Sequence, residues 1–182
     1  MSFRTRTSPT APPAALFDPP AWWKVALVLF AVVIAQSTIA PHVALRGAVP
    51  GLVLLLVLWY GFRTDVVGGL LLGAIAGACE DALAGPSGAG WTVSTAIVGA
   101  LAGRSAGTFI SESRTWLVPY VALATIVRYG VYAIVTRAEG QPIVLPTMHA
   151  HEMLWQALYN AVLAFALLTF VPKTGVSRVG LR

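Results

Sequence analysis

The chain has 182 residues, of which 57% are hydrophobic and only 10% are charged. Soluble globular domains carry about 25% charged residues, so this composition excludes an ordinary soluble domain and indicates a membrane protein. The formal net charge is +5, but the sequence lacks the basic patch interleaved with aromatic residues that a nucleic-acid interface needs. We therefore expect this chain to contact membrane lipids and not nucleic acid.

Six apolar segments follow one another along the chain. Each meets or approaches the roughly 20 residues that a membrane-spanning helix needs, and they cover 24–40, 48–62, 66–83, 91–108, 116–136 and 153–171. Short connections separate them, so the sequence predicts one all-α domain of six transmembrane helices over 22–172. Residues 1–21 are rich in proline and are expected to form a disordered cytoplasmic tail, and 173–182 a short basic cytoplasmic tail.

The basic residues predict the orientation of these spans. With six spans the two termini share one side, and that side holds nine Lys and Arg residues against two, Arg46 and Arg137, on the other. Cytoplasmic loops carry the basic excess, so we expect a multi-pass protein with both termini in the cytoplasm. A signal peptide cleaved after Ala40 is the rival interpretation, but Pro41 would follow the cut directly and the apolar stretch is long for such a signal.

Glycines recur at every fourth position in the third and fourth segments. They are Gly69, Gly73, Gly77, Gly99, Gly103 and Gly107. This spacing places small residues on one face of each helix, so that two helix backbones can approach closely in lipid. Asp81 continues the first of these ladders at the same spacing. We expect a close-packed seam between two helices, with a carboxylate at its end.

Ionisable residues inside the spans are costly and are candidates for function or for buried pairing. Glu80 and Asp81 fall near the outer end of the third span, and Arg128 lies about 13 Å from the outer end of the fifth, at 1.5 Å per residue. We expect Arg128 to pair with Asp81 or Glu80 and to hold helices in register. Contact with a partner protein, and transport or proton transfer, are the alternatives.

His149, His151 and Glu152 open the sixth segment on the same outer side. We interpret them as a polar outer rim. A metal site is the alternative, although zinc takes three or four converging ligands and Asp81 would have to complete the set. The sequence carries no nucleophile elbow, phosphate loop, paired-cysteine motif or metalloprotease helix motif. We therefore expect no metal, no cofactor and no enzymatic activity.

Read in order, several loose motifs over residues 24–171 resemble the rod-shape-determining protein MreD family. The glycine-rich third span that ends in Asp81 is one of them. The others centre on Gln36, Pro50, Tyr159 and Asn160. The chain departs from the family pattern at Gly51, where members commonly have an aspartate after the proline.

The resemblance implies a non-enzymatic scaffold of the bacterial cell-elongation (rod) complex, located in the plasma membrane. It further implies binding to MreC, and through MreC a link between MreB filaments and the peptidoglycan synthase made of RodA and a class-B penicillin-binding protein. Members are also similar in fold to the substrate-binding subunits of energy-coupling-factor transporters. A solute-binding subunit of a vitamin transporter is therefore the alternative function.

Overall fold

The structure is a computed structural model that describes residues 21–84, 88–109, 116–140 and 146–170. The side chains of residues 107–109, 146–149, 168 and 170 also lie outside this description. The tails expected at 1–21 and 173–182 fall outside the described residues, apart from Ala21.

The described residues form six α-helices and one short 3-10 helix. In chain order these are α1 (Trp22–Thr38), η1 (Ala40–Val43), α2 (Leu52–Gly61), α3 (Val66–Ala84), α4 (Gly90–Phe109), α5 (Leu117–Ala138) and α6 (Pro146–Phe170). The predicted all-α fold is confirmed. Two boundaries differ from the expected segments: α2 has only 10 residues, and α6 begins at Pro146 instead of at residue 153.

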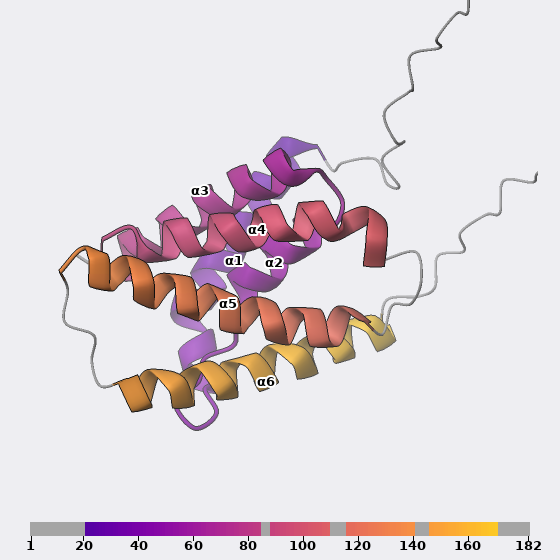
Figure 1. Cartoon of the computed structure of the whole chain (residues 1–182). Coiled ribbons are helices and arrows are strands. Elements are labelled where there is room, and N and C mark those ends of the chain that lie inside the picture. Colours follow the sequence, from indigo (N-terminus) through magenta and orange to yellow (C-terminus); the bar gives the residue numbers. More distant parts are fainter. Residues whose placement is uncertain (1–20, 85–87, 110–115, 141–145, 171–182) are drawn as a thin grey trace, which may run out of the picture.

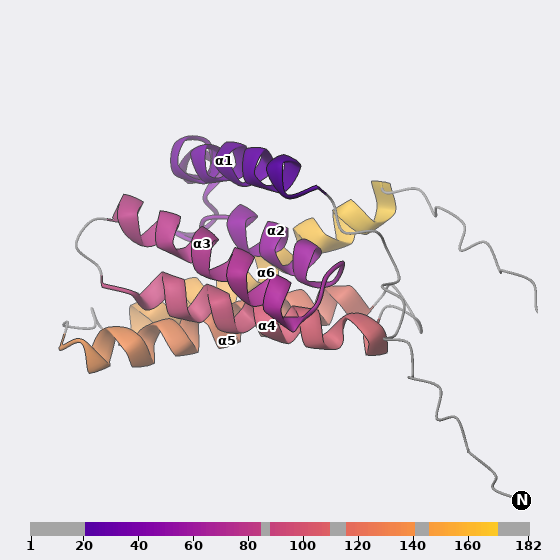
Figure 2. The same ribbon diagram turned by 90° about the horizontal axis from the view of Figure 1, so that it is seen from above.

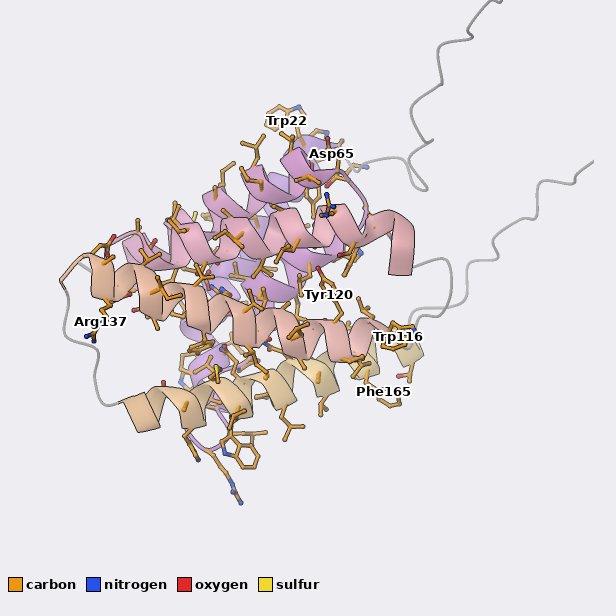
Figure 3. The ribbon with its side chains drawn as sticks, viewed as in Figure 1. Trp22, Asp65, Trp116, Tyr120, Arg137 and Phe165 are labelled. Atoms are coloured by element: carbon orange, nitrogen blue, oxygen red, sulfur yellow. The ribbon has the colours of Figure 1, made fainter. Side chains whose placement is uncertain are left out.

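The helices α3, α4, α5 and α6 lie along roughly the same direction, each beside the next (Figure 1). Asp65 and Trp116 mark one end of the bundle and Arg137 marks the other (Figure 3); we call these the Asp65 end and the Arg137 end. α2 lies in the interior, in contact with α1, α3, α4 and α5. α1 lies at the outside of the bundle, against α2 and α3 (Figure 2).

The helix α2 is short because the chain before it is held in a different conformation. Leu45 and Ala48 exchange two backbone hydrogen bonds of 2.9 Å across a tight turn at Arg46 and Gly47, whose φ angles are 51° and 86°. Pro50 then disfavours helical geometry at the preceding residue, so the helix begins only at Leu52. Ten residues extend about 15 Å, half of a roughly 30 Å hydrocarbon core.

The core surrounds this half-length helix. One cluster of buried residues joins Leu54 and Leu58 of α2 to α4 and α5, and a second joins Val53 and Val57 of α2 to α1 and α3. Large apolar side chains also cover the outside, as lipid contact allows; Phe165, which is 58% exposed, points away from the bundle (Figure 3). By length and composition, α3 and α5 are apolar enough to cross a membrane, and α1 and α2 are apolar but shorter.

The glycine ladders meet at the contact between α3 and α4. A Cβ atom added to an α3 glycine would collide with the backbone of α4: Gly69 faces Gly99, Gly73 faces Thr95, and Gly77 faces Trp91. Each step of four residues along α3 is thus matched by a step of four back along α4. Gly103 packs on the backbone of Asp65 in the same way. The surroundings of Gly107 lie outside the described side chains.

We predict that Gly73→Ala lowers the melting temperature of the detergent-solubilised protein, because its Cβ would lie 2.9 Å from the Cα of Ala96 and overpacking of this kind costs about 1–3 kcal/mol. Gly130→Ala is the matched control. A Cβ at Gly130 of α5 would meet nothing within 4 Å, and alanine gains helix propensity of up to about 1 kcal/mol over glycine. Equal losses in both variants would contradict the close-packed seam.

Candidate functional site

Polar side chains are buried at two places in the bundle. The first, which we call the arginine network, consists of Arg128, Glu80, Thr95 and Trp91. The second, which we call the α2-start network, consists of Gln36, Gly51, Thr125, Gln156 and Asn160 with the backbone that they contact. Polar groups in a lipid-embedded bundle must find partners within the protein, so these networks show what constrains the helices.

The arginine network joins three helices through one side chain. Arg128 of α5 is only 2% exposed. Its Nη2 donates to Oε2 of Glu80 on α3 in an ion pair, and its Nε donates to Oγ1 of Thr95 on α4 at 2.9 Å. The guanidinium carbon also lies 4.5 Å from the ring centroid of Trp91. The buried charge is therefore paired, hydrogen-bonded and placed against an aromatic ring.

Aromatic rings of α5 hold Trp91 in position. The Trp91 ring stacks on Tyr132 with centroids 4.1 Å apart, and it meets Tyr129 edge-on at 5.6 Å. The residues expected to form the site did not include Trp91, Thr95 or these tyrosines. A signal for two of them exists, because Thr95 and Trp91 continue the second glycine ladder at steps of four before Gly99.

Asp81 caps the start of α4. Its carboxylate accepts hydrogen bonds from the backbone N–H of Trp91 at 3.0 Å and of Thr92 at 2.8 Å, and from the Thr92 hydroxyl at 2.7 Å. A carboxylate at a helix N-terminus satisfies free N–H groups and complements the helix dipole. Of the two carboxylates expected near Arg128, the structure therefore pairs Glu80 with the arginine and uses Asp81 as a cap.

The α2-start network satisfies the first backbone amides of α2 from other helices. The N–H of Gly51 donates to Oδ1 of Asn160 on α6 at 2.8 Å, and the N–H of Leu52 donates to Oε1 of Gln36 on α1 at 2.7 Å. A helix start leaves such N–H groups without an acceptor inside the helix. The N–H of Leu52 also donates to the carbonyl of Pro50 at 3.1 Å. Side chains of α1 and α6 therefore contribute acceptors at the start of α2.

Three further hydrogen bonds fix α6 and the connection before α2. Nδ2 of Asn160 donates to Thr125 Oγ1 of α5 at 3.1 Å, and Nε2 of Gln156 donates to the carbonyl of Val49 at 2.6 Å. The hydroxyl of Tyr159 donates to the carbonyl of Val43 at 3.1 Å. The four expected motif residues, Gln36, Pro50, Tyr159 and Asn160, thus all lie at the start of α2 or contact the connection before it. Pro50 is buried beside Gly51.

Gly51 and Asn160 depend on each other. A Cβ atom at position 51 would lie 2.8 Å from Nδ2 of Asn160, so an aspartate there would collide with Asn160 as it stands. Asn160 Oδ1 accepts from the N–H of Gly51 itself, whereas an aspartate N-cap would accept from N–H groups two or three residues further into the helix. At Gly51, where the family pattern has an aspartate, a side chain of α6 therefore binds the start of α2.

The expected polar rim is only partly described. His151 is exposed and its Nε2 accepts a hydrogen bond of 3.0 Å from Trp155 Nε1, while the guanidinium carbon of Arg46 lies 4.4 Å from the Trp155 ring centroid. Glu152 is partly buried, and the side chain of His149 lies outside the description. In the part of the chain that the structure describes, no group of three or more His, Cys, Asp and Glu residues is arranged to hold a metal ion.

We predict a strong coupling between Glu80 and Arg128. Glu80→Leu or Arg128→Leu alone leaves one buried charge without its partner, and each should lower the free energy of unfolding by about 3–5 kcal/mol. The double variant removes both charges and should recover much of that loss. Unfolding of the three variants in detergent measures the coupling, and strictly additive losses would rule the pairing out.

We predict that removing the Asp81 cap on α4 lowers the free energy of unfolding by less than breaking the Glu80–Arg128 pair does. Asp81→Ala removes acceptors from the first turn of α4 and should cost about 0.5–2 kcal/mol. Asp81→Asn keeps one side-chain oxygen and should lose less than Asp81→Ala. Thermal unfolding of both variants in the same detergent checks the order, and unchanged stability in Asp81→Ala would show that the cap is not needed.

Comparison with known proteins places the chain in a family. No curated protein and no solved structure matches it, so the expected similarity to energy-coupling-factor subunits stays a prediction. A family model described as rod shape-determining protein MreD matches residues 21–174, which include both buried networks. The chain therefore belongs to the MreD family of rod shape-determining proteins.

Proposed function

We propose that this chain is a non-enzymatic scaffold of the bacterial cell-elongation complex, and that it binds MreC through helix faces within the plasma membrane. Through MreC it connects MreB filaments to RodA and its class-B penicillin-binding protein. The observation that carries this proposal is the use of the buried polar groups. Glu80, Asp81, Arg128 and Asn160 all bond to other helices of the same chain, which makes the interior a rigid support.

The space beside Glu80 is small for a vitamin. The cavity there has a volume of about 180 Å³, whereas small-molecule pockets usually have about 300–1,000 Å³. The outer surface of the bundle exposes large apolar side chains that a partner helix could contact. In α1 only Val25 and Leu29 are buried, while Trp22, Leu27 and Phe30 are 79%, 64% and 70% exposed.

In the proposed topology both termini are cytoplasmic, and the Asp65 end faces the cytoplasm. The basic side chains of Arg63 and Arg104 belong to that end, at the turn before α3 and near the end of α4, which agrees with the basic excess of cytoplasmic loops. The α2 helix and the connection before it then cross the membrane together, because α2 alone covers only half of its thickness.

We predict that the protein, solubilised in mild detergent from its native membranes, co-purifies with MreC. An unrelated single-span membrane protein carrying the same affinity tag is the control and should recover no MreC. Depletion of the protein should in addition turn rod-shaped cells round, as seen by light microscopy. A preparation that retains a small solute and none of the cell-wall proteins would overturn the scaffold and favour the transporter subunit.

A further inference from the structure

A groove lies between α1 and α3, where α2 begins. Three helices line it, with Val33, Gln36 and Ser37 from α1, Val53 from α2, and Glu80, Leu83 and Ala84 from α3. Its volume is about 180 Å³. The groove follows from the short central helix, because α2 begins only at Leu52 and so does not extend between α1 and α3 towards the Arg137 end.

Glu80 lines this groove and has one carboxylate oxygen, Oε1, that accepts no hydrogen bond from the described residues. Its Oε2 accepts from Arg128, but no donor among the described residues reaches Oε1. The side chain is 14% exposed and lines the groove. An ionised carboxylate offers about four acceptor positions, so capacity for hydrogen bonding remains. Glu80 lies four residues before the end of α3 at Ala84, about 6 Å along the helix axis.

Gln36 brings an unused donor to the same groove. Its Oε1 accepts from the N–H of Leu52, whereas no acceptor in the described part of the chain contacts its Nε2. A side-chain amide has two N–H donors on that nitrogen. The groove therefore combines a carboxylate acceptor on one wall with an amide donor on the other.

The charge at the groove is already balanced. Arg128 pairs with Glu80, so the two side chains together carry no net charge. A cationic lipid headgroup would add a charge that nothing else at the groove neutralises. A neutral group that both donates and accepts, such as a Ser or Thr hydroxyl or an Asn or Gln amide, matches Glu80 and Gln36 without that cost.

We propose that this groove seats the transmembrane helix of a partner protein, which places one hydroxyl or side-chain amide against Glu80 and Gln36. The proposal rests on the scaffold function above and names the site where that scaffold binds. The groove has room for one side chain, and the apolar walls beside it continue the contact. Leu83 is 60% exposed on α3 and Ile34 is 46% exposed on α1, and both suit packing against a helix in lipid.

The test fills the groove and measures MreC recovery. Leu83→Trp places a large ring at the groove rim and should reduce the MreC that co-purifies at least tenfold. Ile134→Trp is the matched control, because Ile134 is 70% exposed on α5, close to the Arg137 end and away from the groove lining. It should recover as much MreC as the wild type.

A second measurement does not depend on the tryptophan variant folding. Ser37→Cys, in a protein that also carries Cys79→Ala, should form a disulfide with single cysteines along one face of the MreC transmembrane helix. Ile134→Cys should form none.

The outcomes separate the two proposals. If the wild type recovers no MreC, the scaffold function fails and the groove proposal fails with it. If Leu83→Trp binds MreC as well as the wild type does, or Ile134→Trp loses it equally, the groove proposal alone is overturned. A phospholipid that is lost from Leu83→Trp with MreC binding unchanged, measured by native mass spectrometry, would identify a lipid as the occupant and overturn the groove proposal as well.

Discussion

The rest of the bundle depends on the need to satisfy the backbone at the buried start of α2. Free N–H groups at a helix start are costly in lipid, where no water replaces the missing acceptors. Here the acceptors come from Gln36 on α1 and Asn160 on α6, and Asn160 is fixed in turn by Thr125 on α5. One half-length helix thus determines where three other helices must lie.

The glycine seam between α3 and α4 allows two adjacent acidic residues, Glu80 and Asp81, to bind different partners. Close approach of α3 and α4 at Gly73 and Gly77 brings Asp81 within hydrogen-bond distance of the first turn of α4. Glu80, one residue earlier, then faces α5 and Arg128. Larger residues in the seam would separate the helices and disturb the cap and the ion pair together.

Features that follow from a repeating pattern within one helix were predicted from the sequence. Features that depend on contacts between distant segments were predicted less well. Four-residue spacing predicted a close-packed seam between two helices, although not that Gly69 faces Gly99. Depth along the spans predicted pairing of Arg128 with Glu80 or Asp81. The length of α2 was wrong by several residues, because apolar composition continues through Val49 although Pro50 and the turn at Gly47 prevent a helix there. The capping role of Asn160 joins positions 109 residues apart, which no local pattern reveals.

The order in which the chain is synthesised gives the capped half-helix a consequence for membrane insertion. Ten apolar residues are too few to form an independent span, and one of the two side-chain acceptors at the start of α2 comes from α6, 109 residues after Gly51. At about 5–20 residues per second, the ribosome needs roughly 5–20 s to produce Asn160. During that interval the start of α2 lacks an acceptor that the finished protein provides. We therefore expect the segment before α2 to reach its final position only after α6 has been synthesised.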